Sequence, residues 1–227
     1  MKKLLLSLSV IALVAVLPAC KKNSPGPSNN ARVMFVNGCA GSVNTDVTIN
    51  NTKFAPGSNL AFLKNSGYQS VTAGTGVNFA FGLTATGTPL IGFTNDLTAN
   101  ANYSAFTGGL VTGTSTSYVF TLDDLTAPTT GKAKVRFINL SADNLNTSCY
   151  IGVAKLDSNV GYKTCTPFFE VSPTTAKVAM IDQTVLTASG DITGQQIVAG
   201  KIYTFMLTGT SSGTLTSAIT LTVINNN

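Results

Sequence analysis

Histidine and tryptophan are both absent from the 227 residues of this chain. Histidine is the commonest general base and metal ligand near neutral pH, so its absence excludes hydrolysis by a Ser-His-Asp or Cys-His arrangement. The cysteines lack the paired spacing of zinc sites, and no glycine-rich phosphate loop is present. The sequence therefore predicts no metal and no cofactor, and it does not favour an enzyme.

Charge is also scarce, because only 10% of the residues are charged while 44% are hydrophobic. An average globular protein has about a quarter of its residues charged. The apolar content is sufficient to form a core, so the low charge does not indicate disorder. A surface covered mainly by hydroxyl and amide groups is typical of exported β proteins.

The N-terminus has the three parts of an export signal: two lysines, an apolar run from Leu4 to Leu17, and small residues before a cleavage point. The run is shorter than the roughly 20 apolar residues that span a bilayer. Leu17-Pro18-Ala19-Cys20 resembles a lipobox, in which the cysteine is lipidated after cleavage. We therefore predict a signal peptide over residues 1–19 and lipidation at Cys20; the alternative is an ordinary signal followed by a chance cysteine.

Residues 20–30 contain Lys21 and Lys22 followed by Asn, Ser, Pro and Gly, a composition typical of a flexible tether. Removing the signal leaves 227 − 19 = 208 residues, with 14 − 2 = 12 basic and 9 acidic side chains, a net charge of about +3. Beyond the tether the chain is close to neutral, which argues against a nucleic-acid partner.

The remainder of the chain is duplicated. Residues 31–37 match residues 133–139 at an offset of 102, and Leu97, Ala99 and Tyr103 match Ile197, Ala199 and Tyr203 at an offset of 100. Within each copy the apolar residues alternate with a period of 2, as Val33 and Phe35 do, and turn residues separate the runs. We expect Lys134 and Arg136, which alternate with Val135 and Phe137, to face outward.

This pattern predicts an all-β protein: two tandem antiparallel immunoglobulin-like β-sandwich domains after the signal peptide and tether. Unit 1 is expected over residues 31–127 and unit 2 over residues 131–227, with the boundary near residues 127–131.

The opening strand carries a family resemblance. Ala31-Arg32-Val33-Met34-Phe35-Val36-Asn37, a later Ala73-Gly74-Thr75 and a tyrosine-containing strand resemble the family of domains of unknown function numbered 4397, and Ala133 to Asp143 is closer still. The resemblance covers nearly all of residues 31–223 and implies repeated β-sandwich units in exported, often lipid-anchored bacterial proteins. It implies no activity, and the chain departs from the family pattern at Pro173 and at its cysteines.

Carboxylates remain the only candidates for catalysis, because a glycoside hydrolase needs just two of them. Most of the nine lie in or beside turns, where they shape the backbone. Asp123-Asp124 could contribute to a calcium site at the domain junction, but calcium takes six to eight oxygen ligands. The nine acids are Asp46, Asp96, Asp123, Asp124, Asp143, Asp157, Glu170, Asp182 and Asp191.

Three cysteines remain after lipidation: Cys39, Cys149 and Cys165. A disulfide is permitted in an exported protein, and one between Cys149 and Cys165 would close a 17-residue loop, worth about 3 kcal/mol. The alternatives are a bridge from Cys39 to one of the others, or three buried thiols that pack as small apolar groups.

Four aromatic residues lie in the part of unit 2 that differs most from unit 1: Tyr150, Tyr162, Phe168 and Phe169. Loops on a rigid sandwich often carry recognition, so these rings form a candidate binding surface. The alternative is that Phe168 and Phe169 pack in the core.

The sequence thus favours a non-catalytic lipoprotein, anchored in the membrane of the cell envelope at Cys20 and acting as a structural or recognition module. One alternative is an adhesin-like component that binds a glycan or protein at the cell surface, and another is a carboxylate-based glycoside hydrolase. The expected location is the outer membrane, on its periplasmic side or at the cell surface. The expected partners are the membrane and an envelope protein or glycan.

Overall fold

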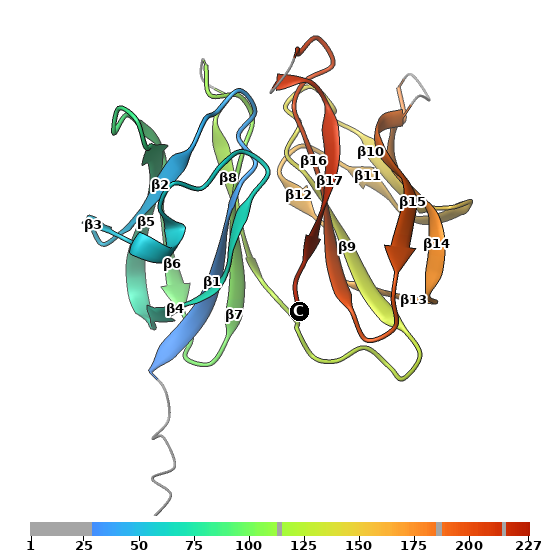
Figure 1. The fold of residues 1–227 in the computed structure, drawn as a ribbon, viewed down its shortest axis with the longest axis horizontal. Helices are drawn as coiled ribbons and strands as arrows, with labels where there is room; N and C mark the ends of the chain where they lie inside the picture. The colour runs from blue at the N-terminus through green and yellow to red at the C-terminus, as the bar shows by residue number, and fades with distance from the viewer. Residues whose placement is uncertain (1–28, 113–114, 185–187, 215–216) are drawn as a thin grey trace, which may run out of the picture.

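The computed structural model describes residues 29–112, 115–184, 188–214 and 217–227. The predicted signal peptide, Cys20 and all of the tether except its last two residues lie outside these ranges. Within the described ranges, no helix has the length and apolar character needed to span a bilayer. The fold is all-β, and its strands form four sheets that pack in pairs as two sandwiches (Figure 1).

The first sandwich, unit 1, consists of two four-stranded sheets. The inner sheet has the order β4 (Asn65–Thr72), β1 (Asn30–Asn37), β7 (Asn102–Gly108), β8 (Ser117–Leu122). The outer sheet has the order β3 (Thr52–Lys53), β2 (Thr45–Ile49), β5 (Gly74–Leu83), β6 (Pro89–Leu97), and a short 3₁₀ turn, η1, spans Ala55–Gly57.

The second sandwich, unit 2, repeats this arrangement. Its inner sheet has the order β12 (Thr164–Cys165), β9 (Ala133–Asn139), β16 (Ile202–Thr208), β17 (Thr220–Asn225), and β13 (Phe169–Val171) also pairs with β9. Its outer sheet has the order β11 (Ala154–Val160), β10 (Thr147–Ile151), β14 (Thr174–Asp182), β15 (Ala188–Ile197).

The expectation of purely antiparallel sheets is wrong in one respect. β1 pairs with β7 in parallel, and β9 pairs with β16 in parallel. Between β1 and β7 the chain crosses to the outer sheet, returns to the inner sheet as β4, and then crosses to the outer sheet again. β7 therefore reaches its place beside β1 through a crossover and not through a hairpin, and parallel neighbours require such a connection.

Each unit has its own apolar core between its two sheets. Val33 and Phe35 lie in the core of unit 1, and Val135 and Phe137 in that of unit 2, as the alternation predicted. Aromatic rings fill much of the first core, where Phe79 lies 5.4 Å from Phe93 between ring centroids.

The two inner sheets face each other across the middle of the molecule (Figure 1). A third apolar cluster lies between them and takes buried side chains from both units: Met34, Val36, Phe106, Ile138, Leu140, Met206 and Ile224. β8 ends at Leu122 and β9 begins at Ala133, so residues 123–132 connect the two units. The inner sheets are therefore buried on both faces.

Candidate functional site

The centre of the joint between the units is a buried ion pair. Arg136 of β9 and Asp123, which follows β8, approach to 2.6 Å between Nη1 and Oδ1, with side chains 2% and 0% exposed. The expectation that Lys134 and Arg136 face outward is therefore wrong, since both are buried against unit 1. Alternation identifies the face of a strand, but it does not say whether water or another sheet covers that face.

Hydrogen bonds extend this ion pair into a closed ring. The Arg136 Nε–H donates to Thr204 at 2.9 Å, and the Thr204 hydroxyl donates to the Asn226 side-chain oxygen at 2.8 Å. The Asn226 amide donates to the Tyr68 hydroxyl at 3.0 Å, and that hydroxyl donates to Asp123 at 2.6 Å. Because Tyr68 and Asp123 belong to unit 1 and the others to unit 2, the ring crosses the joint twice.

The polar groups of the ring are almost fully satisfied. Asp123 accepts hydrogen bonds from Arg136, Tyr68, Ser104 and Thr121. Arg136 donates four, to Asp123, Thr121, Ser104 and Thr204. Burial raises the pKa of Tyr68, and the charge of Asp123 raises it further, so the Tyr68 hydroxyl remains protonated and able to donate. A buried ion pair with full hydrogen bonding avoids most of the desolvation cost of isolated charges.

Apolar packing at the joint is equally specific. Leu140 of unit 2 inserts between Gly38 and Gly108 of unit 1, where added Cβ atoms would lie 2.9 Å from Leu140 carbons. The Thr208 hydroxyl donates to the Gly38 carbonyl at 2.5 Å. Position 38 corresponds to position 140 in the repeat, so glycine in one copy makes room for leucine from the other.

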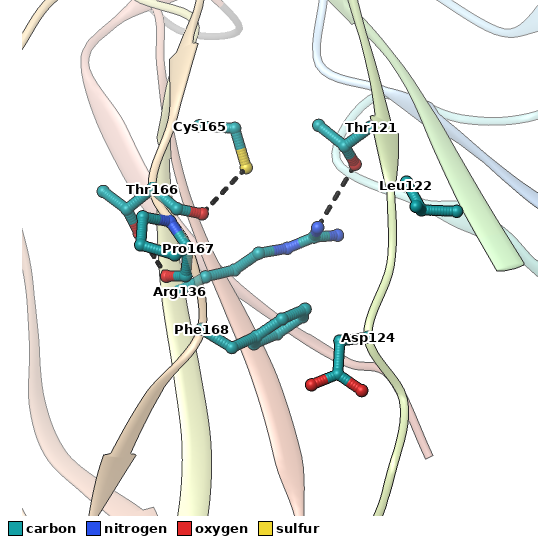
Figure 2. A pocket seen from close by; sticks show the side chains of 8 residues that line it. All are labelled: Thr121, Leu122, Asp124, Arg136, Cys165, Thr166, Pro167 and Phe168. Atoms are coloured by element: carbon teal, nitrogen blue, oxygen red, sulfur yellow. Dashed lines mark hydrogen bonds between the residues drawn. The ribbon is translucent and has the colours of Figure 1, made fainter.

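A cleft of about 410 Å³ opens at the edge of the joint, between β8 and the segment that carries β12 and β13. Figure 2 shows Arg136 reaching across it toward Thr121, with the Phe168 ring beside the guanidinium. The guanidinium carbon lies 4.5 Å from the Phe168 ring centroid, a cation–π contact. Four of the five guanidinium N–H groups are already used, so the cleft lacks a free cation for binding an anionic ligand.

The predicted Cys149–Cys165 disulfide is wrong, because both residues are free thiols, as is Cys39. Cys149 lies in the core of unit 2, whereas Cys165 packs against the cluster between the units. The inner sheet of unit 2 separates them. Burial raises the pKa of all three thiols, that of Cys39 to about 11, so none of them is an activated nucleophile.

We expect iodoacetamide at pH 8 to leave the two fully buried thiols, Cys39 and Cys149, unmodified in the native mature protein and to modify all three thiols in urea without reductant. Intact-mass spectrometry counts the additions. The reason is that the raised pKa and burial of each thiol are lost on unfolding. If two cysteines of the unfolded protein reacted only after reduction, the result would contradict three free thiols and support a disulfide.

The four aromatic residues predicted as a binding surface do not share one surface. Phe169 packs against the core of unit 2, and Phe168 covers Arg136. The Tyr162 hydroxyl donates across the joint to the Ser115 carbonyl at 2.7 Å, and its oxygen lies 2.7 Å from the Ser117 hydroxyl oxygen. Tyr150 alternates with the core residues Cys149 and Ile151 and so faces the opposite side of β10.

The adjacent carboxylates at the junction contact cations of the protein itself. Asp123 binds Arg136, and Asp124 lies 2.7 Å from the Lys134 ammonium. The hydrogen bond from Lys134 makes the largest contribution to lowering the pKa of Asp124 to about 2, and hydrogen bonds from the Thr126 hydroxyl and N–H lower it further. The described residues contain no group of three or more ligating side chains that could hold a metal. The calcium hypothesis therefore loses the two carboxylates on which it rested.

A second cavity, of about 540 Å³, lies at the end of unit 2 where β16 turns into β17. Two carboxylates line it, Asp143 and Asp182. The Asp143 oxygens accept hydrogen bonds from Ser141, Asn144 and Ser211. Burial raises the pKa of Asp143, but hydrogen bonds outweigh this effect and lower the pKa below its usual value. Asp143 is therefore unsuited to act as a general acid, which requires a raised pKa.

Sequence reasoning missed Tyr68, Thr204 and Asn226 as members of the ring, and it missed Ser104 as a hydrogen-bond partner of both Asp123 and Arg136. One signal was present in the repeat, where arginine at position 136 corresponds to methionine at position 34. Where one copy has a charged residue and the other has an apolar residue at the same position, the two copies have different surroundings at that position.

The comparison with protein families matches residues 31–148 to DUF4397, a domain of unknown function. The match covers more than half of the chain, and the protein belongs to this family. No curated protein matches the chain.

Three solved structures are similar at low TM-scores. A candidate cell adhesion protein from Bacteroides uniformis is 11% identical, with a TM-score of 0.26, over 88% of this chain and 100% of that one. CBMbc (family CBM26) from Eubacterium rectale Amy13K, in complex with maltoheptaose, is 10% identical, with a TM-score of 0.25, over 87% and 97%. A candidate polysaccharide-binding protein (DUF1812) from Bacteroides thetaiotaomicron is 10% identical, with a TM-score of 0.20, over 87% and 98%. At these TM-scores the likenesses assign no function.

Proposed function

We propose that this chain is a non-catalytic lipoprotein of the cell envelope, anchored through Cys20, whose two family-type units act together as one rigid recognition or structural module. The observation that carries the proposal is the buried ring through Arg136 and Asp123, which crosses the joint between the units. A protein that only needed two independent domains on a tether would have no use for a desolvated ion pair between them.

The chemistry of the two cavities supports the absence of catalysis. In the cleft, Arg136 is held by four hydrogen bonds, and burial raises the pKa of the Cys165 thiol. In the second cavity, the oxygens of Asp143 already accept hydrogen bonds from the protein. These groups hold the structure, and they are not poised to accept or release a proton.

Anchoring is the part of the proposal with the simplest test. We expect Cys20→Ser to abolish incorporation of a labelled fatty acid, because Cys20 is the proposed site of acylation. The protein should also leave the membrane fraction, because stable attachment needs two or more acyl chains. Cys39→Ser is the matched control, since the corresponding residue of unit 2 is Ser141. Fatty-acid labelling that persists in Cys20→Ser would refute the anchor.

Orientation is tested by adding protease to intact cells. Degradation of the units would place them at the cell surface and favour an adhesin-like role, whereas protection would place them in the periplasm and favour an envelope partner. Either location agrees with an outer-membrane anchor.

A further inference from the structure

The second cavity lies at the end of the molecule remote from the start of β1. In Figure 1, β1 begins at the lower end, while the turns that follow β9 and β16 lie at the upper end. These turns supply Asp143, Asn144, Thr210 and Ser211 to the cavity wall. The chain therefore enters the folded part at the end opposite the cavity.

The corresponding place in unit 1 is built differently. The repeat aligns Asp143 with Gly41, and it aligns Thr210-Ser211 with Leu110-Val111. In unit 1 the Val111 N–H donates to the Ala40 carbonyl at 2.9 Å, and an added Cβ on Gly41 would lie 3.2 Å from Val111. Glycine and aliphatic residues therefore pack this turn closely in unit 1.

In unit 2 a side chain takes over the role of that carbonyl. The Ser211 N–H donates to the Asp143 carboxylate at 2.8 Å, and the Ser211 hydroxyl donates to the same oxygen at 2.6 Å. A longer polar link replaces the direct backbone contact between the two turns. Unit 2 has thus exchanged apolar contacts for polar side chains that line a cavity of about 540 Å³.

Two polar groups at the cavity have hydrogen-bonding capacity that no hydrogen bond among the described residues uses. The Ser189 hydroxyl oxygen is buried without a hydrogen-bond partner among the described residues. Asp182 uses Oδ1 to accept the Thr184 N–H at 2.6 Å. A buried hydroxyl without a partner costs free energy that a hydrogen-bonding ligand would recover.

We propose that this cavity binds a neutral saccharide. The lining combines carboxylate, amide and hydroxyl groups, which recognise vicinal hydroxyls as both donors and acceptors. Among the described residues, no lysine or arginine lines it, so an anionic sugar or phosphate would meet the two carboxylates unfavourably. The proposal rests on the recognition role proposed above and gives that role a ligand class and a site.

The test is binding of the mature protein to an array of neutral, sialylated and sulfated oligosaccharides. We expect retention of neutral members only. The variant Asp143→Gly, Asn144→Ser, Thr210→Leu, Ser211→Val gives unit 2 the residues of unit 1 and should weaken binding about tenfold or more, because smaller and apolar side chains replace much of the polar wall of the cavity.

Asp182→Asn is the milder variant for the case in which that graft fails to fold, and it should also weaken binding. Its control is Asp157→Asn, which alters a carboxylate that accepts a backbone N–H elsewhere in unit 2. Absence of neutral glycan binding, cleavage of the bound glycan, or affinity unchanged by Asp182→Asn would each overturn the proposal. Because anchoring is measured separately through Cys20, such a failure would leave the proposed envelope role standing.

Discussion

Asp123→Ala is expected to destabilise the protein by about 3–5 kcal/mol, the usual cost of removing one partner from a buried ion pair. The variant leaves the Arg136 guanidinium, 2% exposed, without its counter-ion. It also removes the acceptor for Tyr68, Ser104 and Thr121. Urea unfolding followed by circular dichroism measures the loss.

The repeat supplies the control for this prediction. Asn226 of unit 2 occupies the position of Asp123, since the two backbone N–H groups donate to equivalent carbonyls of β16 and β7, and Met34 corresponds to Arg136. The double variant Asp123→Asn, Arg136→Met should therefore lose less stability than Asp123→Ala, because no buried charge remains. A double variant as unstable as Asp123→Ala would show that the ion pair is not the source of the effect.

Leu140→Ala is expected to cost about 2–5 kcal/mol, the range for truncating a fully buried leucine. Leu140 is 0% exposed and fills the space beside Gly38 and Gly108 across the joint. Relaxation around the new cavity is restricted, since the backbone of unit 1 forms its wall. Thermal and urea unfolding measure the change.

Leu145→Ala is the matched control for Leu140→Ala, because Leu145 is 67% exposed and lies only five positions along the chain. It should change stability by less than about 0.5 kcal/mol, as surface substitutions usually do. Equal losses in the two variants would contradict the packing of Leu140 between the glycines of unit 1.

The local rules of the strands allowed much of the fold to be predicted. Alternation assigned Val33, Phe35, Val135 and Phe137 to the cores correctly, because it depends only on the geometry of a strand. The all-β sandwich architecture followed from these alternating runs and from the turn residues between them. The parallel pairing of β1 with β7 did not, because it depends on how the chain crosses between sheets.

The candidate site depended on contacts between distant parts of the chain, and the sequence carried little signal for them. Arg136 meets Tyr68 and Asp123 only because two whole sheets face each other. The proposed Cys149–Cys165 bridge failed for a similar reason, since spacing along the chain does not reveal which side of a sheet each thiol occupies. The differences between the two copies, at Arg136 against Met34 and at Asp143 against Gly41, were the most useful indications available.

Calorimetric unfolding of the mature protein tests the rigid joint between the units most directly. If the buried ring and the Leu140 contact join the units, a single transition is expected, with equal calorimetric and van 't Hoff enthalpies. The Asp123→Ala variant should separate this transition into two. Two independent transitions in the unaltered protein would contradict the account, because they would show that each unit folds without support from the other.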